Sequence, residues 1–221
     1  MKYRSVFDII GPIMVGPSSS HTAGAVRIGN LSRRVFGDVP LKVDITLYGS
    51  FSKTYKGHGT DVALIAGVLG FDTFDRRIPS SLVIAKDKGI DVNFYFSDEE
   101  TRHPNTARLK LANAFKQSEL VGVSIGGGKV EIEEVDGFKL ENIVFNDSLL
   151  LILHKDKYGM IERVSNILAS WKINISYMQV SRKEKGLTSL MLIKTDEDVK
   201  EFLIEEIRSL KDIYNVIFLN I

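Results

Sequence analysis

The last part of the chain alternates between two kinds of apolar pattern, and no other feature limits its possible folds as much. Short apolar runs predict strands at residues 149–153, 173–180, 187–194 and 216–219. Between them, two segments carry apolar residues three or four positions apart, which predicts two amphipathic helices: Ile161, Val164, Leu168 and Trp171, then Val199, Leu203, Ile207 and Leu210. Polar residues 182–186 separate the second and third runs, as in a hairpin. The order β-α-β-β-α-β within about 72 residues is that of the ferredoxin-like unit.

The preceding part of the chain mixes helical and strand patterns less regularly. A helix is expected over residues 22–36, with an apolar stripe and a glycine at its end, from Ala25, Ile28, Leu31 and Val35 to Gly37. A short buried helix is expected at 62–69, closed by Gly70, and strands at 41–47, 92–96 and 107–111. Residues 121–125 and 130–135 predict a hairpin around three consecutive glycines. We therefore expect an α+β domain over residues 1–146 and a ferredoxin-like domain over 147–221.

Composition excludes several classes of function. A formal net charge of +1 gives no electrostatic footprint for nucleic acid or for an anionic membrane surface. The apolar runs are far shorter than the roughly 20 residues of a membrane span, and no sustained apolar region follows the N-terminus. The sequence has no cysteine, so this chain can hold neither a disulfide nor a metal or cluster bound by thiolates. A cytoplasmic protein is the simplest interpretation.

The first candidate site is a serine-rich segment that leads directly into the expected helix. Three consecutive serines precede His21 and Thr22, although a helix needs only one of them as an N-cap. Free backbone N–H groups at a helix start, together with adjacent hydroxyls, form a natural seat for a carboxylate or a phosphate. We interpret Ser18, Ser19, Ser20 and Thr22 as anion-binding candidates; a capped helix beside an exposed loop is the alternative.

Two further segments combine histidine with turn-forming residues. Glycines flank His58, which lets the backbone bend and a ligand approach closely, and Thr60 or Asp61 is the expected cap of the helix that follows. A flexible connector with an incidental histidine is the alternative. His103 precedes Pro104, Asn105 and Thr106 at the start of a strand, where a polar turn is the competing interpretation.

Together, the three histidines favour acid–base chemistry on a small anionic substrate over metal binding. No two of them have the short spacing, such as i and i+4, that indicates a zinc site, so we expect no metal in this chain. Acid–base catalysis needs only a histidine that titrates near neutrality and reaches the proton it moves. The fourth histidine, His154, ends an expected strand and is interpreted as an ordinary surface or loop residue.

These motifs resemble a known family. The run from Asp8 to Gly24 closely resembles the N-terminus of the β chain of bacterial iron–sulfur L-serine dehydratases, and residues 56–61 and 103–106 match that family in the same order. The C-terminal part resembles an ACT domain, with Tyr158 and Gly159 in its first loop and Asn174 before its second strand. The resemblance covers essentially the whole chain. It implies an allosteric-substrate-binding-like serine dehydratase β domain followed by an ACT domain.

The resemblance also implies an activity and a partner. Enzymes of this family convert L-serine to pyruvate and ammonia without pyridoxal phosphate, using a [4Fe–4S] cluster that acts on the substrate hydroxyl as a Lewis acid. Because such clusters need cysteine ligands and this chain has none, it resembles the two-subunit form, with the cluster on a cysteine-containing α subunit. The chain alone is then expected to be inactive.

Site residues carry over by position. The resemblance implies that Ser18, Ser19, Ser20 and Thr22 hold the carboxylate of L-serine or order the site, with Asn105 and Thr106 as further substrate contacts. His21, His58 and His103 become the candidates for acid–base work, and we favour His58 as the base because its flanking glycines suit a residue that meets a substrate. Tyr158, Gly159 and Asn174 are expected to bind an effector where two ACT domains associate. A purely regulatory, anion-sensing subunit without catalytic residues is the alternative function.

Overall fold

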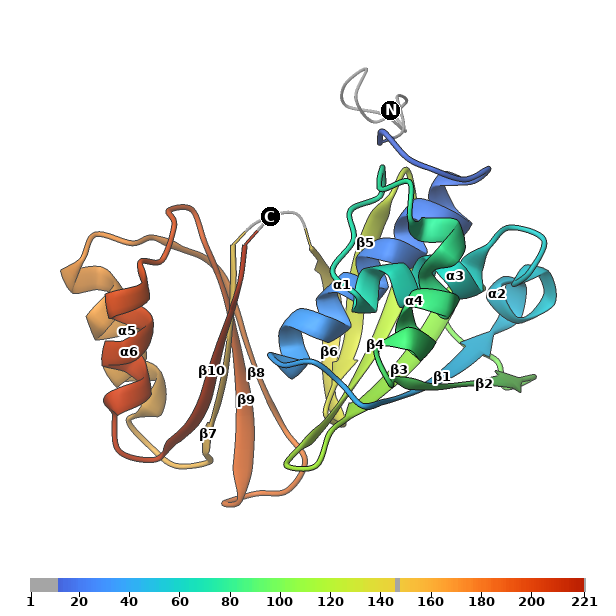
Figure 1. Cartoon of the computed structure of the whole chain (residues 1–221). Helices are drawn as coiled ribbons and strands as arrows, with labels where there is room; N and C mark the ends of the chain where they lie inside the picture. Colours follow the sequence, from blue (N-terminus) through green and yellow to red (C-terminus); the bar gives the residue numbers. More distant parts are fainter. Residues whose placement is uncertain (1–11, 146–147, 221) are drawn as a thin grey trace. The chain divides into compact units, whose positions relative to one another are not determined.

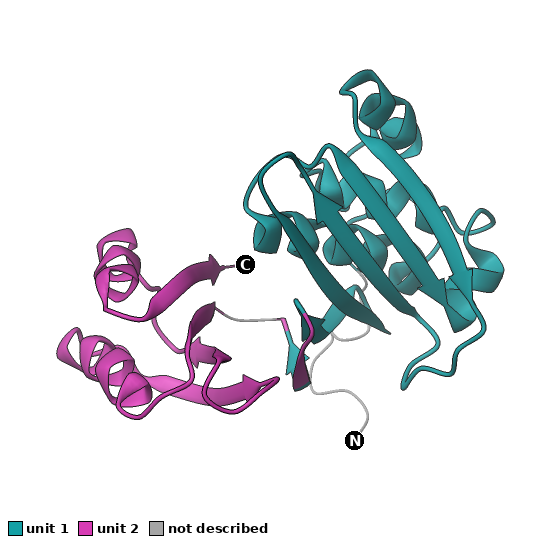
Figure 2. Ribbon diagram, turned by 90° about the horizontal axis from the view of Figure 1, so that it is seen from below, with its two compact units in different colours: residues 1–136, 141–144 teal, residues 137–140, 145–221 magenta. Residues whose placement is uncertain are grey.

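The computed structural model describes residues 12–145 and 148–220, which form two compact units (Figures 1 and 2). One unit comprises residues 1–136 and 141–144, and the other comprises residues 137–140 and 145–221. The predicted domain boundary at residues 146 and 147 lies outside the described residues, as does the start of the serine-dehydratase-like run at Asp8. None of the described helices is long and apolar enough to cross a membrane.

The N-terminal unit is built on a six-stranded sheet with helices on one face (Figure 1). The strand order is β2-β1-β3-β4-β5-β6, in which β1 and β2 run parallel and the β1–β3, β3–β4 and β4–β5 pairs are antiparallel. The strands are β1 (Lys42–Tyr48), β2 (Asp91–Ser97), β3 (Thr106–Ala112), β4 (Gln117–Gly126), β5 (Lys129–Val135) and β6 (Phe138–Val144). The predicted strands and hairpin of this unit are therefore confirmed, with shifts of a few residues at their ends.

Two long helices of this unit pack against each other through glycine. They are α1 (Gly24–Phe36) and α3 (Thr60–Val68). A Cβ on Gly29 would lie 2.1 Å from the carbonyl oxygen of Leu64, and one on Gly67 would lie 2.0 Å from that of Val26. Only glycine permits so close a backbone approach. The predicted apolar stripe of α1 is buried, and Gly37 ends the helix in the left-handed conformation, with φ of 69°.

Several elements of the N-terminal unit were not predicted from the sequence. They include the short helices α2 (Gly49–Thr54) and α4 (Ser81–Asp87) and the sixth strand, β6. Both helices are shorter than two full turns, too short to show a helical period. The predicted cap of α3 is also wrong, because Gly59 occupies the N-cap position and no side chain caps the helix.

The C-terminal unit has the predicted β-α-β-β-α-β order and a four-stranded sheet with two helices on one face (Figure 1). The strand order is β10-β7-β9-β8, and all neighbouring pairs are antiparallel. The elements are β7 (Leu149–Lys155), α5 (Met160–Ser170), β8 (Ile175–Arg182), β9 (Thr188–Thr195), α6 (Glu201–Ser209) and β10 (Ile213–Leu219). This arrangement is the ferredoxin-like fold.

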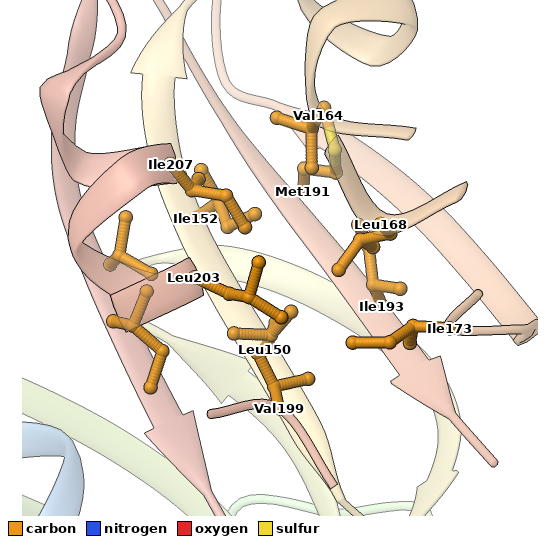
Figure 3. Close-up of a cluster of buried hydrophobic side chains, with 12 residues drawn as sticks. Leu150, Ile152, Val164, Leu168, Ile173, Met191, Ile193, Val199, Leu203 and Ile207 are labelled. Carbon is orange, nitrogen blue, oxygen red and sulfur yellow. The ribbon is translucent and has the colours of Figure 1, made fainter. Parts of the chain in front are cut away.

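Figure 3 shows the core of this unit, in which side chains of α5 and α6 meet those of the sheet. Val164 and Leu168 are fully buried as predicted, but Ile161 and Trp171 are 49% and 54% exposed. Met160 takes the predicted place of Ile161 in the core. The predicted apolar face of α5 was therefore wrong at both ends.

The expectation for His154 was also wrong. It lies within β7 and is 2% exposed, so it is a buried residue. Its Nδ1 is 2.8 Å from the carbonyl oxygen of Lys155. It lies on the same face of the strand as Leu150 and Ile152, which belong to the core, because alternate residues of a strand share a face.

Candidate functional site

The serine-rich segment forms a helical turn rather than a loop. Residues Ser19–Ala23 make one π-helical turn that continues directly into α1. Ser18 is the N-cap, and its Oγ accepts a hydrogen bond of 3.1 Å from the backbone N–H of His21. A cap of this kind contributes about 1 kcal/mol to stability. Ser18 thus has the structural role that one of the three serines was predicted to have, and the other two are not used as caps.

His21 is held by hydroxyl groups on both ring nitrogens. Its Nδ1 lies 3.0 Å from Ser20 Oγ and 3.5 Å from Ser18 Oγ, and its Nε2 lies 2.9 Å from Ser50 Oγ. The edge of the ring also packs against Phe51, with centroids 5.3 Å apart. A serine hydroxyl can donate or accept, so these contacts orient the ring in either neutral tautomer.

The first two candidate histidines meet in space although 37 positions separate them in the sequence. The ring centroids of His21 and His58 lie 4.9 Å apart. Two threonines connect the same segments: Thr22 Oγ1 donates to the carbonyl oxygen of His58 at 3.0 Å, and Thr60 Oγ1 donates to that of His21 at 3.1 Å. Thr60 is therefore a connecting residue, which explains why it does not cap α3.

Burial lowers the pKa of His21 below its ordinary value of 6.5, and the nearby charge of His58 lowers it further. Two imidazolium ions at this separation would repel each other, so the pair does not hold two protons readily. At neutral pH His21 is consequently in its neutral form. A neutral imidazole can accept a proton, so His21 can act as a base or can assist a neighbouring base.

The third candidate histidine joins this cluster through its backbone neighbours. The carbonyl oxygen of Pro104 accepts hydrogen bonds from the backbone N–H groups of Ser50 at 2.7 Å and Phe51 at 3.3 Å. His103 Nδ1 accepts from the N–H of Asn105 at 3.1 Å, and its carbonyl oxygen accepts from Thr106 Oγ1 at 2.7 Å. The ring of His103 is thus used to shape its own turn.

Gly49 allows this contact between segments. It has a φ of 51°, and a Cβ at this position would lie 2.7 Å from the carbonyl oxygen of Pro104. The start of α2 can therefore approach the turn after His103 only with glycine at position 49.

Sequence reasoning missed two residues of the cluster. Ser50 bonds to His21 from α2, and Ser124 lies at the end of β4, beside Asn105. No local pattern marks either residue, because each is a lone serine next to a glycine-containing or apolar segment. The place of Ser124 follows from sheet order, which brings β4 next to β3 and both toward the start of α1. The place of Ser50 follows from the backbone hydrogen bond between the start of α2 and Pro104.

Three buried polar atoms around this cluster have no hydrogen-bond partner within residues 12–145 and 148–220: His58 Nδ1, Asn105 Oδ1 and Ser124 Oγ. Buried polar groups are normally hydrogen-bonded, and each exception needs an explanation. The region therefore combines three polar atoms without a partner among the described residues, two adjacent histidines and a serine-lined helix start.

The predicted effector residues of the C-terminal unit are not brought together. Tyr158 and Gly159 precede α5 and are exposed, whereas Asn174 follows its end. An 11-residue helix spans roughly 16 Å, so the two positions lie far apart within one copy. Asn174 donates its backbone N–H to Glu197 at 2.7 Å and its side-chain amide to Asp196 at 2.6 Å. A site containing all three residues needs a second copy of the chain.

Within the described part of the chain, no group of three or more histidine and acidic side chains is placed to hold a metal ion. The sequence has no cysteine either, so this chain does not fit an iron–sulfur cluster as its own resident group.

Comparisons with known proteins agree with the two-unit architecture. Residues 5–135 match the family model of the serine dehydratase beta chain, and residues 150–215 match that of the AHAS small subunit-like ACT domain. The chain is 50% identical over 216 residues to a probable L-serine dehydratase beta chain of Bacillus subtilis, with 98% of each chain covered. It is 36% identical over 196 residues to the L-serine dehydratase beta chain of Peptoniphilus asaccharolyticus, with 88% of this chain and 87% of that one covered.

A more distant match includes a different enzyme. The chain is 30% identical over 201 residues to D-3-phosphoglycerate dehydrogenase of Methanocaldococcus jannaschii, covering 89% of this chain but 37% of that protein. A family model that matches more than half of the chain, and relatives that align over nearly its full length, lead to one conclusion. The chain belongs to the family of serine dehydratase β chains and carries a C-terminal ACT domain.

Proposed function

We propose that this chain is the β subunit of an enzyme that converts L-serine to pyruvate and ammonia, acting with a cysteine-containing α subunit in the cytoplasm. The observation that carries the proposal is the contact between His21 and His58, 4.9 Å apart, beside a serine-lined helix start. An anion-sensing subunit would more often recruit arginine or lysine than a pair of histidines. Family membership supports the same activity.

In this proposal the π-helical turn Ser19–Ala23, which leads into α1, binds the substrate carboxylate. The N-terminal end of a helical segment carries partial positive charge, and Ser19 and Ser20 are the first two residues of this turn. Thr22 and Thr106 act indirectly, because both hydroxyls donate to backbone carbonyls of the histidine segments. They order the site instead of contacting the substrate.

His58 is the proposed base. Both ring nitrogens of His21 are within 3.0 Å of serine hydroxyls, and His103 Nδ1 already accepts a backbone N–H. His58 Nδ1, by contrast, has no partner among the described residues. His58 takes the α-proton, and the β-hydroxyl leaves and takes up that proton to form water. The aminoacrylate formed tautomerises to an imine, which hydrolyses to pyruvate and ammonia.

A [4Fe–4S] cluster on the α subunit, without pyridoxal phosphate, completes the proposal. When present, such a cluster supplies a Lewis acid that makes the substrate hydroxyl a better leaving group. Its ligands are proposed to lie wholly on the partner, since this chain has no cysteine. The β subunit contributes the carboxylate seat and the base.

Anaerobic co-expression with a cysteine-containing α chain, followed by a pyruvate assay, tests the proposal. We expect the complex to be coloured and to release pyruvate from L-serine, and the isolated β chain to be colourless, folded and inactive. Turnover by the purified β chain alone would contradict the two-subunit assignment. A complex that contains the cluster but is unaffected by loss of the three histidines would instead support the purely regulatory alternative.

The ACT domain is proposed to self-associate and to bind an amino-acid effector. Tyr158 and Gly159 of one copy would face Asn174 of another, which accounts for their separation within one chain. Equilibrium dialysis with L-serine, the first candidate effector, checks this part of the proposal. Loss of binding in a Gly159→Val variant is the expected result, because a β-branched residue cannot adopt the φ of 81° at this position without strain, so the loop must change its conformation.

A further inference from the structure

A buried hydroxyl group lies against the start of α1, and none of the predicted site residues accounts for it. Ser124 is fully buried, and within the described ranges its Oγ has no hydrogen-bond partner. A Cβ built on Gly24 would lie only 2.0 Å from Ser124 Oγ, so this hydroxyl points at the first residue of α1. A buried hydroxyl without a partner destabilises a protein, so its presence here requires another explanation.

A second unpaired atom belongs to the residue beside it. Ser124 N donates to the carbonyl oxygen of Asn105 at 3.0 Å, and Asn105 Nδ2 donates to the carbonyl oxygen of Ser124 at 3.4 Å. Because the amide nitrogen is used in this way, Asn105 Oδ1 is the free end of the side chain, and it is buried without a partner in the described chain. A carbonyl oxygen can only accept hydrogen bonds.

These two atoms lie in the same cluster as the histidines. Asn105 follows Pro104, whose carbonyl oxygen accepts from Ser50 N, and Ser50 Oγ contacts His21 Nε2. Ser124 in turn lies against Gly24, the first residue of α1, which follows His21 by three positions. These contacts connect Ser124 and Asn105, through Pro104 and Ser50, with the turn that carries His21.

We propose that Ser124 Oγ and Asn105 Oδ1 bind the α-ammonium group of the amino-acid substrate. This inference rests on the proposed function, in which the helix start binds the carboxylate. An ammonium group has three donors and no acceptor, which matches one carbonyl oxygen and one hydroxyl oxygen that both lack a donor. A carboxylate at the same place would face the negative end of the Asn105 amide. Ser124 thus selects amino acids over hydroxy acids.

The test compares two fully buried serines, one whose hydroxyl makes a hydrogen bond and one whose hydroxyl makes none to the described residues. Ser81 is also fully buried, but its Oγ donates to the carbonyl oxygen of Val62 at 2.6 Å. In thermal melts of the full chain, we expect Ser81→Ala to lower the melting temperature and Ser124→Ala to leave it unchanged or raise it. The Ser124→Ala substitution removes a buried hydroxyl that makes no hydrogen bond to the described residues, so no such hydrogen bond is lost.

Steady-state kinetics of the α–β complex give the functional readout. We expect Ser124→Ala to raise KM for L-serine by about tenfold or more with little change in kcat, as for a lost hydrogen bond to a charged group. Ser81→Ala should leave KM unchanged. The inhibition constant of 3-hydroxypropanoate, which keeps the carboxylate and hydroxyl but lacks the ammonium group, should be the same in wild type and Ser124→Ala.

The outcomes separate this inference from the proposed function. A wild-type complex that turns over L-serine, with an unchanged KM in Ser124→Ala, overturns the inference alone. Equal weakening of L-serine and 3-hydroxypropanoate also overturns it, because the hydroxyl would then not recognise the ammonium group. A wild-type complex without serine turnover overturns both.

Discussion

His21 and His58 form a pair whose members differ in their contacts. Hydroxyl groups hold His21 through both ring nitrogens, whereas Nδ1 of His58 has no partner in the described part of the chain. A residue fixed on both sides orients its neighbour, and a residue with a free nitrogen can exchange a proton with a substrate. We therefore propose that His21 positions His58 and that His58 exchanges the proton.

Replacing His58 by Ala is expected to lower kcat of the α–β complex by roughly 10² to 10⁴. The folded state should persist, since His58 is only half-buried at a loop and its truncation leaves little cavity. Lys56→Ala, an exposed change in the same loop, is the matched control and should keep wild-type kcat. Wild-type turnover in His58→Ala would remove His58 as the base.

The lowered pKa of His21 predicts a pH effect on stability. In the unfolded chain this histidine titrates near its ordinary 6.5, but in the folded chain its pKa is lower. At pH values between these two pKa values the unfolded state therefore binds more protons than the folded state. The resulting stability is fully present above about pH 6.5 and is lost as pH falls toward the lowered value. Glutamine in the His21→Gln variant cannot titrate. The melting temperature of this variant should therefore fall less than that of wild type between about pH 8 and pH 5.

Parallel losses in the two proteins over that range would contradict the pKa argument. The difference between the two melting curves is the informative quantity, because titrating groups away from the His21–His58 pair contribute equally to both.

At the scale of elements, the N-terminal unit depends on the close contact between α1 and α3. Glycines at positions 29 and 67 bring each backbone against a carbonyl oxygen of the other helix. This contact fixes the segments that carry His21 and His58, since one precedes α1 and the other precedes α3. Helix packing thus sets the distance between the two histidines.

Gly67→Ala is expected to destabilise the protein by about 1–3 kcal/mol, the range of core overpacking. The new Cβ would lie 2.0 Å from the carbonyl oxygen of Val26 and 2.6 Å from the backbone nitrogen of Asn30, so a helix must move. Helix propensity alone predicts the opposite sign, about 1 kcal/mol of stabilisation. Urea unfolding measures the change.

Gly57→Ala serves as the control for this substitution. A Cβ at position 57 would meet the carbonyl oxygen of Thr54 at an ordinary 3.6 Å, so the unfolding midpoint should hardly change. A more stable Gly67→Ala protein would show that the helices do not pack as closely as described.

At the scale of the whole molecule, the ACT sheet leaves two edge strands, β8 and β10. Edge strands expose backbone hydrogen-bonding groups and are commonly covered by pairing, most simply across a two-fold axis. We therefore expect the full chain to sediment as a concentration-dependent oligomer. A monomer at every concentration would contradict this prediction.

Lysine substitutions can identify the edge that pairs. Val180 on β8 and Tyr214 on β10 are 41% and 56% exposed, so neither Val180→Lys nor Tyr214→Lys should disturb the core. Charge on an edge opposes strand pairing. The substitution at the pairing edge should shift the sedimentation profile toward monomer, and the other should act as its control.

The sequence by itself determined the features that depend on neighbours along the chain. Local periodicity and turn chemistry predict the β-α-β-β-α-β order, the apolar stripe of α1 with the glycine at its end, and the hairpin of β4 and β5. The serine-rich segment and the segments around His58 and His103 were likewise predicted as candidate sites from their local residue patterns. Local interactions favour these features whatever the rest of the chain does.

Only the tertiary structure decided which of these segments meet and what each residue contacts. His21 bonds to Ser50, and Ser124 points at Gly24, across separations of 29 and 100 positions along the sequence. The same holds for Ile161, Trp171 and His154, whose burial depends on how α5 and β7 pack and was predicted wrongly. Such contacts follow from sheet order and from the glycine contact between α1 and α3, which bring distant residues together and leave no periodic pattern in the sequence.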